Sequence, residues 1–161
     1  MELKLELSSK AVSSASPITI LLVDDELLEF KVLELKLAST PEFKLGVDYA
    51  ATIAEAVLKV RAGDYQMILV DNRLFPNNDF RETVPQLRRA GYTGPIGVIS
   101  ADISDAYFQQ FPQYGVDFRI GKDELDYHAI RHIIGEYVNK KLPDDWYQEG
   151  VVSVTENGLS S

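Results

Sequence analysis

The chain has 161 residues, enough for one domain with a sizeable core and too few for two comfortable ones. Its net charge of -9 disfavours nucleic acid as the main partner, because binding phosphate requires clustered Lys and Arg. The absence of cysteine excludes disulfides and thiolate metal sites and is compatible with a reducing cytoplasm. No apolar run approaches the roughly 20 residues of a membrane span. We therefore expect a cytoplasmic protein that contacts neither nucleic acid nor membrane.

Residues 1–17 have the composition of an arm or linker. They alternate leucine with charge, then become rich in serine, and they lack the apolar segment of a signal peptide. This segment is either a flexible arm or a strand that pairs with a sheet edge. Residues 18–23 then form an apolar run typical of a buried strand. A helix pattern follows the acids at 24–26 and stops near Ser39.

The next elements continue the alternation of strand and helix. Residues 44–51 have the pattern of an edge strand. Thr52 and Glu55 form a capping box, which predicts a helix that ends at Gly63. The apolar run 67–70 follows and is bounded by polar residues, as expected for a strand buried on both faces of a parallel sheet.

The second half of the chain contains the same pattern. A helix is predicted from about Phe80 to Ala90, with a late start or a kink because Pro85 lies inside it. Residues 95–99 form another apolar strand. The remaining predicted elements are a short helix closed by Pro112 and Gly115 (104–111), a last strand (116–120) and a final helix (123–142).

Five βα repeats with short connections predict one α/β domain over residues 18–142. Such a domain is a doubly wound parallel sheet with helices on both faces. The tail, residues 143–161, has no helical pattern, although residues 151–155 have strand propensity. The tail is therefore either disordered or docked on the domain.

Polar residues follow the strands at the points where they end. Asp24 and Asp25 follow the first strand, and Asp71, Ser100 and Lys122 follow three later ones. Because parallel strands share one carboxyl edge, these side chains should point into one crevice. Three neighbouring carboxylates need a cation, and oxygen ligands with open positions favour Mg²⁺. A carboxylate beside Mg²⁺, an ammonium and a hydroxyl is equipped to accept a phosphoryl group.

Four segments carry a resemblance to a known family: residues 22–26, 68–71, 98–101 and 120–122. In their order and spacing they resemble the response-regulator receiver (CheY-like) domains of two-component signalling. The resemblance covers about residues 18–142. It implies a flavodoxin-like fold, (βα)5, with the strand order 2-1-3-4-5.

The resemblance also implies a role for each matching residue. Asp71 would be the phosphoacceptor, forming an aspartyl phosphate. Asp25 and Asp71 would ligate Mg²⁺, with Asp24 helping through water and the backbone carbonyl of Arg73 as a further ligand. The phosphoryl group would also contact the catalytic ammonium and the switch hydroxyl, which are Lys122 and Ser100. The small Ala101 would leave access to the phosphate.

The chain departs from the family pattern in its expected readout region. Receivers commonly have an aromatic switch residue three positions before the lysine, whereas this chain has Arg119 there, with Phe118 beside it. The usual proline after the lysine is Asp123. In the loop after the phosphoacceptor, Phe75 replaces a common proline and Pro76 comes one residue later. We expect the chemistry to be kept and the readout surface, Arg119 included, to be altered.

The resemblance implies a phosphoacceptor in a two-component or phosphorelay pathway. A sensor histidine kinase or a histidine phosphotransferase would supply the phosphoryl group, and a downstream protein target would read the change. A homodimer is also possible. Such a protein catalyses its own phosphorylation and dephosphorylation but is not otherwise an enzyme. The alternative function is a pseudo-receiver, a protein-interaction module that works without phosphorylation.

The polar residues have two further interpretations. The acids at 24, 25 and 71 could serve only as helix caps and loop residues, but their coincidence with Ser100 and Lys122 argues against this. A Mg²⁺-dependent phosphatase would need an acid two residues after its nucleophile, and Arg73 occupies that position.

Overall fold

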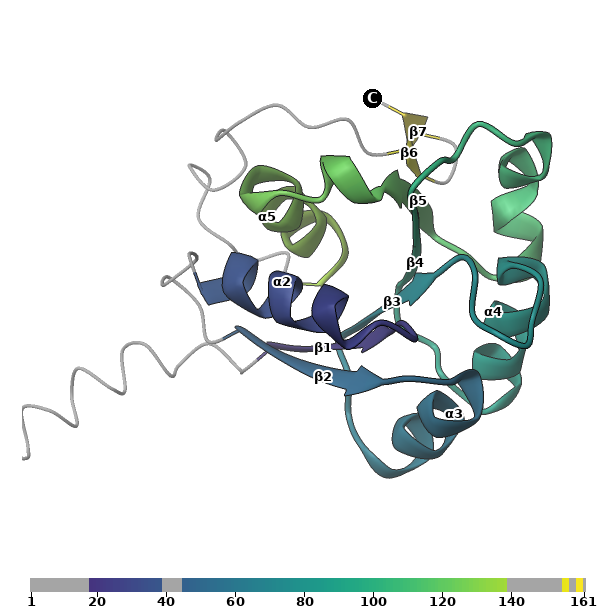
Figure 1. The fold of residues 1–161 in the computed structure, drawn as a ribbon, viewed down its shortest axis with the longest axis horizontal. Helices are drawn as coiled ribbons and strands as arrows, with labels where there is room; N and C mark the ends of the chain where they lie inside the picture. The colour runs from purple at the N-terminus through teal and green to yellow at the C-terminus, as the bar shows by residue number, and fades with distance from the viewer. Residues whose placement is uncertain (1–17, 39–44, 139–154, 157–158, 161) are drawn as a thin grey trace, which may run out of the picture.

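The computed structural model describes residues 18–38, 45–138, 155–156 and 159–160 (Figure 1). The predicted arm, residues 1–17, lies outside the described residues. The end of the predicted domain and most of the predicted tail do so as well. Among the helices of the described ranges, none is long and apolar enough to cross a membrane.

Five parallel strands form the main sheet in the order 2-1-3-4-5, which confirms the predicted fold class. They are β1 (Ile18–Val23), β2 (Leu45–Ala50), β3 (Met67–Asp71), β4 (Ile96–Ser100) and β5 (Phe118–Gly121). Every residue of β3 and β4 is buried, because helices cover both faces of the sheet. The central strands finish at one edge, where Asp71 lies beside Ile99.

Helices pack on both faces of the sheet (Figure 1). On one face lie α2 (Leu27–Ala38) and α5 (Tyr127–Tyr137), which share a core with the inward side chains of the strands. On the other face lie α3 (Ile53–Ala62), α4 (Phe80–Arg89) and the 3-10 helix η1 (Ala106–Tyr114), over a second core. This is the doubly wound arrangement that alternating strands and helices predicted.

The capping box predicted at the start of α3 is present with one difference. The Thr52 hydroxyl accepts a hydrogen bond from the Glu55 N–H at 3.1 Å, as expected. The Glu55 carboxylate, however, accepts from the N–H of Ala51 at 2.9 Å rather than from that of Thr52. The helix ends at Gly63, as predicted.

The helix predicted from about Phe80 to Ala90 is found as α4, Phe80–Arg89, with Pro85 inside it. Of the two predicted effects of Pro85, the late start is therefore wrong, and the kink stays a prediction. The Asp79 carboxylate caps it by accepting from the N–H of Arg81 at 2.9 Å. Phe80 is fully buried and anchors the first turn. Pro85 has no N–H, so the helix loses one backbone hydrogen bond and the stability that this bond would provide. The Asp79 cap and the burial of the apolar face compensate for this loss.

The two predicted elements at 104–111 and 123–142 are displaced. The first is a 3-10 helix over Ala106–Tyr114, so that Pro112 lies within it, and Gly115 ends it with a φ of 88°. The second begins only at Tyr127, after the short 3-10 helix η2 (Lys122–Glu124), and ends at Tyr137.

The late start of α5 has a local cause. The Asp126 carboxylate accepts from the N–H of Ala129 at 2.9 Å and so caps α5. The Glu124 carboxylate instead accepts from the N–H of Gly121 at 3.1 Å, which stabilises the preceding turn. Because the Glu124 and Asp126 carboxylates cap different turns, the single helix predicted from the sequence is found as η2 followed by α5.

Beyond β5 the sheet continues with two short antiparallel strands. Thr155–Glu156 (β6) pairs with β5, and Leu159–Ser160 (β7) pairs with β6. Of the two alternatives for the tail, docking is found for these residues. Residues 151–154 of the predicted strand lie outside the described residues.

Candidate functional site

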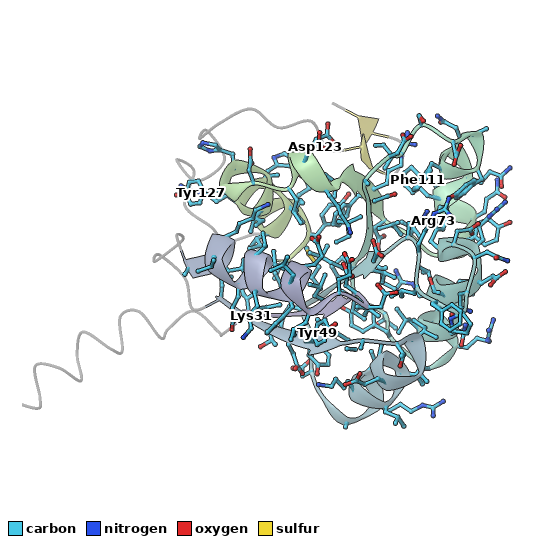
Figure 2. All side chains as sticks on the ribbon, in the orientation of Figure 1. Lys31, Tyr49, Arg73, Phe111, Asp123 and Tyr127 are labelled. Carbon is cyan, nitrogen blue, oxygen red and sulfur yellow. The ribbon has the colours of Figure 1, made fainter. Side chains whose placement is uncertain are left out.

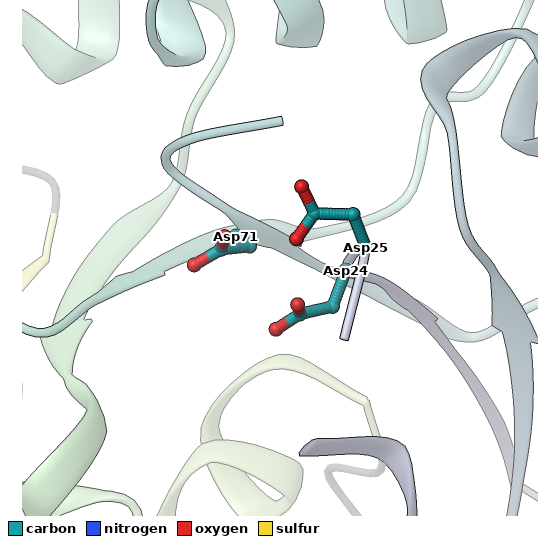
Figure 3. A group of neighbouring side chains, drawn as sticks. All are labelled: Asp24, Asp25 and Asp71. Atoms are coloured by element: carbon teal, nitrogen blue, oxygen red, sulfur yellow. The ribbon is translucent and has the colours of Figure 1, made fainter. Parts of the chain in front are cut away.

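Three aspartates gather where β1 and β3 end (Figure 3). Asp71 is the last residue of β3, and Asp24 and Asp25 directly follow β1. One carboxylate oxygen from each residue lies within 4.8 Å of the others. Asp24 and Asp71 are buried, whereas Asp25 is exposed. The cluster is therefore enclosed by the fold and open to solvent at Asp25.

Lys122, which directly follows β5, brings a positive charge to this cluster. Its Nζ lies 3.3 Å from Oδ1 of Asp71 and 3.8 Å from Oδ2 of Asp24. It also lies 3.9 Å from Glu29 on the first turn of α2. Sequence reasoning missed Glu29, whose one signal was its place in the helix that leaves this edge of the sheet.

Burial and mutual repulsion perturb the charges of the cluster. Burial, reinforced by Asp24, raises the pKa of Asp71 to about 7. Burial likewise raises the pKa of Asp24 to about 6, although the Glu26 N–H and Lys122 oppose the shift. Burial alone would lower the pKa of Lys122, but the nearby carboxylates outweigh it and raise that pKa. The Lys122 ammonium is thus the counter-charge for several carboxylates at neutral pH.

The residues of the cluster fit a divalent cation. Oδ2 of Asp24 is buried and accepts no hydrogen bond from the described residues. Oxygen ligands this close, with an exposed side for water, suit a hard cation such as Mg²⁺. Asp24, Asp25 and Asp71 are the residues that would hold it. The additional ligand predicted at the Arg73 carbonyl stays a prediction.

A pocket of about 270 Å³ adjoins the cluster. It brings together most of the predicted site residues and adds several that sequence reasoning missed. Its lining residues are Asp71, Asn72, Arg73, Ser100, Ala101, Asp102, Asp105, Tyr107 and Lys122. The pocket is large enough for a phosphoryl group beside Asp71.

The Ser100 hydroxyl lies in this pocket but bonds to its own loop. It donates to the carbonyl of Asp102 at 3.1 Å and accepts from the N–H of Asp102 at 3.3 Å. Ser100 is almost completely buried, whereas Ala101 is exposed at the pocket wall. The hydroxyl must therefore leave Asp102 before it donates to a group on Asp71.

Phe118 and Arg119 are not among the residues that line the pocket. Phe118 is fully buried and stacks on Tyr137 of α5, with ring centroids 5.1 Å apart. Arg119 lies over the ring of Phe111 at 5.5 Å, and burial lowers its pKa. Its Nε is buried and has no acceptor among the described residues. Figure 2 shows Phe111 on the same side of the sheet as Arg73, opposite Tyr127.

Asn72 is a second residue that sequence reasoning missed. It is 1% exposed, and its Oδ1 accepts from the N–H of Phe80 at 3.1 Å. Its Nδ2 donates to the hydroxyl of Tyr107 at 2.8 Å. It therefore links the end of β3 to α4 and η1. An amide directly after the phosphoacceptor candidate was the available signal.

Comparison with known proteins yields structural likeness alone. No family model and no curated protein match the sequence. A CheY-like response regulator receiver domain protein from Methanospirillum hungatei matches with a TM-score of 0.64 and 21% identity, covering 84% of this chain and 100% of that one. The chain has the receiver-domain fold. The resemblance seen in the sequence is thus confirmed at the level of fold.

Two other receiver folds bear on the site. One is the receiver domain of the sensor histidine kinase PA1611 from Pseudomonas aeruginosa, which has magnesium coordinated in its active-site cleft. It matches at 23% identity and a TM-score of 0.59, covering 76% of this chain and 98% of that one. The other is the Saccharomyces cerevisiae Ssk1 receiver domain, solved with the histidine phosphotransfer protein Ypd1. It matches at 20% identity and a TM-score of 0.62, covering 76% and 89%.

Proposed function

We propose that this receiver fold is a phosphoacceptor that takes a phosphoryl group from phosphohistidine onto Asp71, with Mg²⁺, and thereby changes its binding to a protein partner. The observation that carries the proposal is the Asp71 carboxylate itself. It lies 3.3 Å from the Lys122 ammonium, beside two further aspartates and against a pocket that admits a phosphoryl group. Nucleophile, counter-charge and space thus meet at one point.

In the proposed reaction a carboxylate oxygen of Asp71 attacks the phosphorus atom. The new P–O bond forms as the P–N bond to the donor imidazole breaks, and the departing nitrogen takes up a proton. Asp71 must be ionised to attack, and the Lys122 ammonium favours that form. A bound Mg²⁺ would neutralise the phosphoryl oxygens.

Ser100 and Lys122 have distinct roles after the transfer. The ammonium remains within reach of the phosphoryl oxygens because it already lies beside Asp71. The Ser100 hydroxyl exchanges its bonds to Asp102 for one to a phosphoryl oxygen, which releases the loop between β4 and η1. Through this exchange, the added charge on Asp71 changes the conformation of the loop and hence the surface that a partner contacts.

The proposed partners follow from the chemistry. The donor is a phosphohistidine on a sensor histidine kinase or a histidine phosphotransferase in a cytoplasmic two-component or phosphorelay pathway. The fold likeness to a receiver solved with such a phosphotransfer protein supports this choice. A downstream protein reads the modified surface. The chain catalyses only its own phosphorylation and dephosphorylation.

The test is to incubate the protein with Mg²⁺ and a small phosphodonor, then to measure its mass. We expect a gain of one phosphoryl group that is lost in base. The matched variants are Asp71→Asn, which removes the nucleophile, and Asp102→Asn, an exposed acid of the pocket wall. We expect no gain in the first and a normal gain in the second.

A gain that survives Asp71→Asn would place the phosphoryl group elsewhere and overturn the proposal. No gain in the unaltered protein, even from a phosphorylated histidine phosphotransferase, would favour the pseudo-receiver, which binds partners without phosphorylation. The Arg119 position, where receivers commonly have an aromatic switch residue, motivates that second function.

A further inference from the structure

A partly buried hydrogen bond fixes Tyr107 on the wall of the Asp71 pocket. Its hydroxyl accepts from the side-chain amide of Asn72 at 2.8 Å. Asn72 is itself fixed, because its Oδ1 accepts from the N–H of Phe80 and its backbone N–H donates to Ile99 at 2.9 Å. The amide adjacent to Asp71 thus determines where the Tyr107 hydroxyl lies.

The hydroxyl of Tyr107 has an unused donor. A phenol can donate one hydrogen bond while it accepts another. The acceptor side is used by Asn72, and no residue in the described parts of the chain accepts the Tyr107 proton. This proton is therefore available to an acceptor that enters the pocket, which Tyr107 lines together with Asp71 and Lys122.

The ring of Tyr107 packs against an aromatic ring and a guanidinium group, which limits its movement. It stacks on Phe108 with centroids 4.8 Å apart. The Arg81 guanidinium lies 4.3 Å from the ring centroid and is itself held by a two-pronged bond to Asp79, at 2.9 and 2.8 Å. Such preorganisation reduces the entropy lost when the hydroxyl binds a ligand.

We propose that the Tyr107 hydroxyl donates a hydrogen bond to the phosphoryl group on Asp71. This inference rests on the proposed function, since it requires that group. A phosphoryl group has three acceptor oxygens and close to two negative charges, so a free and oriented donor on the wall of the same pocket suits a charge-assisted bond to it. Because Tyr107 belongs to η1, the bond also ties that helix to the phosphorylation state of Asp71.

The test uses beryllium fluoride with Mg²⁺, which forms a phosphoryl-like adduct on an aspartate carboxylate without a donor protein. Tyr107→Phe removes the hydroxyl and keeps the ring that packs against Phe108 and Arg81. We expect it to weaken beryllium fluoride binding by roughly 10-fold, as for loss of a hydrogen bond to a charged group, with unchanged Mg²⁺ affinity. The melting temperature should fall slightly, because the buried Asn72 amide loses its acceptor. Tyr114→Phe, the same change on η1 outside the pocket lining, should bind within about twofold of the unaltered protein.

Fluorine-19 NMR supplies a measurement that a purely structural role would not affect. A bound fluorine that accepts from the Tyr107 hydroxyl shifts when water is replaced by D₂O, and we expect one fluorine to lose that shift in Tyr107→Phe. Equal binding in Tyr107→Phe and unaltered protein overturns the inference and leaves the proposed function intact. A parallel loss of Mg²⁺ affinity also overturns it. Failure of the unaltered protein to bind beryllium fluoride contradicts the proposed function instead.

Discussion

The Lys122 ammonium lies 3.3 Å from a carboxylate oxygen of Asp71, although β4 separates the strands that carry the two residues. The contact spans two strand spacings because the lysine side chain is long and both residues lie at the carboxyl edge of the sheet. The same ammonium is within 4 Å of Asp24 and Glu29. It is therefore the one cation shared by three carboxylates in this set of contacts.

Replacing Lys122 by Met should destabilise the metal-free protein in a pH-dependent way. At pH 8 the neighbouring carboxylates are ionised, and loss of their cation should lower the free energy of unfolding by about 1–2 kcal/mol. This loss is below the roughly 3–5 kcal/mol typical of fully buried pairs, because the Lys122 side chain is one-quarter exposed. At pH 5 the loss should be smaller, because Asp71, with a pKa of about 7, and Asp24, with a pKa of about 6, then carry protons. Urea unfolding at both pH values measures the difference.

Lys31→Met is the matched control for that experiment. Lys31 lies 3.9 Å from Glu34 on the surface of α2, and both side chains are more than half exposed. Its removal should change the free energy of unfolding by no more than about 0.5 kcal/mol. An equal loss in Lys122→Met at pH 5 and pH 8 would contradict the charge-based account.

The metal-free protein should lose stability as the pH rises from about 4 to about 7. In the folded state the pKa values of Asp24 and Asp71 lie above their ordinary value of 3.8. Between these limits the folded state binds more protons than the unfolded state, so raising the pH favours unfolding. Mg²⁺ binds the ionised carboxylates, and its stabilising effect should therefore grow from pH 5 to pH 8. Thermal melting with and without Mg²⁺ tests both trends.

Asp24→Asn should flatten the dependence of stability on pH. It removes one buried carboxylate with a raised pKa, and it removes a charge that raises the pKa of Asp71. It should also reduce the Mg²⁺ effect at pH 8. Asp102→Asn is the control, since Asp102 is exposed and its hydrogen bond from Ser104 lowers rather than raises its pKa. The raised pKa values of Asp24 and Asp71 would be refuted if the stability of the metal-free protein rose from about pH 4 to about pH 7. They would also be refuted if Asp24→Asn left the pH dependence unchanged.

The sequence predicted the carboxyl-edge cluster because a simple rule applies there. Buried apolar runs end in Asp24, Asp71 and Ser100, and parallel strands bring their ends to a common edge. No knowledge of loop conformation was needed, since each residue either ends its strand or directly follows it. The same holds for Lys122. These residues are where the prediction and the structure agree most closely.

Contacts that depend on loop and helix placement were beyond that rule. The Asn72–Tyr107 bond requires that η1 start at Ala106 and turn as a 3-10 helix, whereas the sequence suggested an ordinary helix over 104–111. The late start of α5 depends on competition between two carboxylates, at Glu124 and Asp126, that the apolar pattern does not register. Tertiary packing and local capping decide such details.

Asp79→Ala should destabilise the protein by about 1–2 kcal/mol, because it removes the cap of α4 and the ion pair with Arg81. Asp105→Ala is its counterpart, since Asp105 precedes η1 but makes no capping hydrogen bond with its side chain. That change should leave stability within about 0.5 kcal/mol. Chemical unfolding of both variants measures the difference, and equal losses would argue against the cap at Asp79.

Gly97→Ala tests the packing between β4 and β5. Gly97 lies beside Phe118, and a Cβ there would fall 2.2 Å from a ring atom of Phe118. Phe118 cannot retreat easily because it is fully buried and stacks on Tyr137. We therefore expect Gly97→Ala to cost about 1–3 kcal/mol in the free energy of unfolding.

The cause of that loss can be isolated with two further variants. Phe118→Leu vacates the ring volume, so the double variant should be less destabilised than the sum of the two single changes. Gly46→Ala on β2 adds the same methyl group where nothing lies within 4 Å, and it should be neutral or slightly stabilising because alanine loses less entropy than glycine on folding. Strictly additive losses for Gly97→Ala and Phe118→Leu would show that the methyl group and the ring do not compete for the same space.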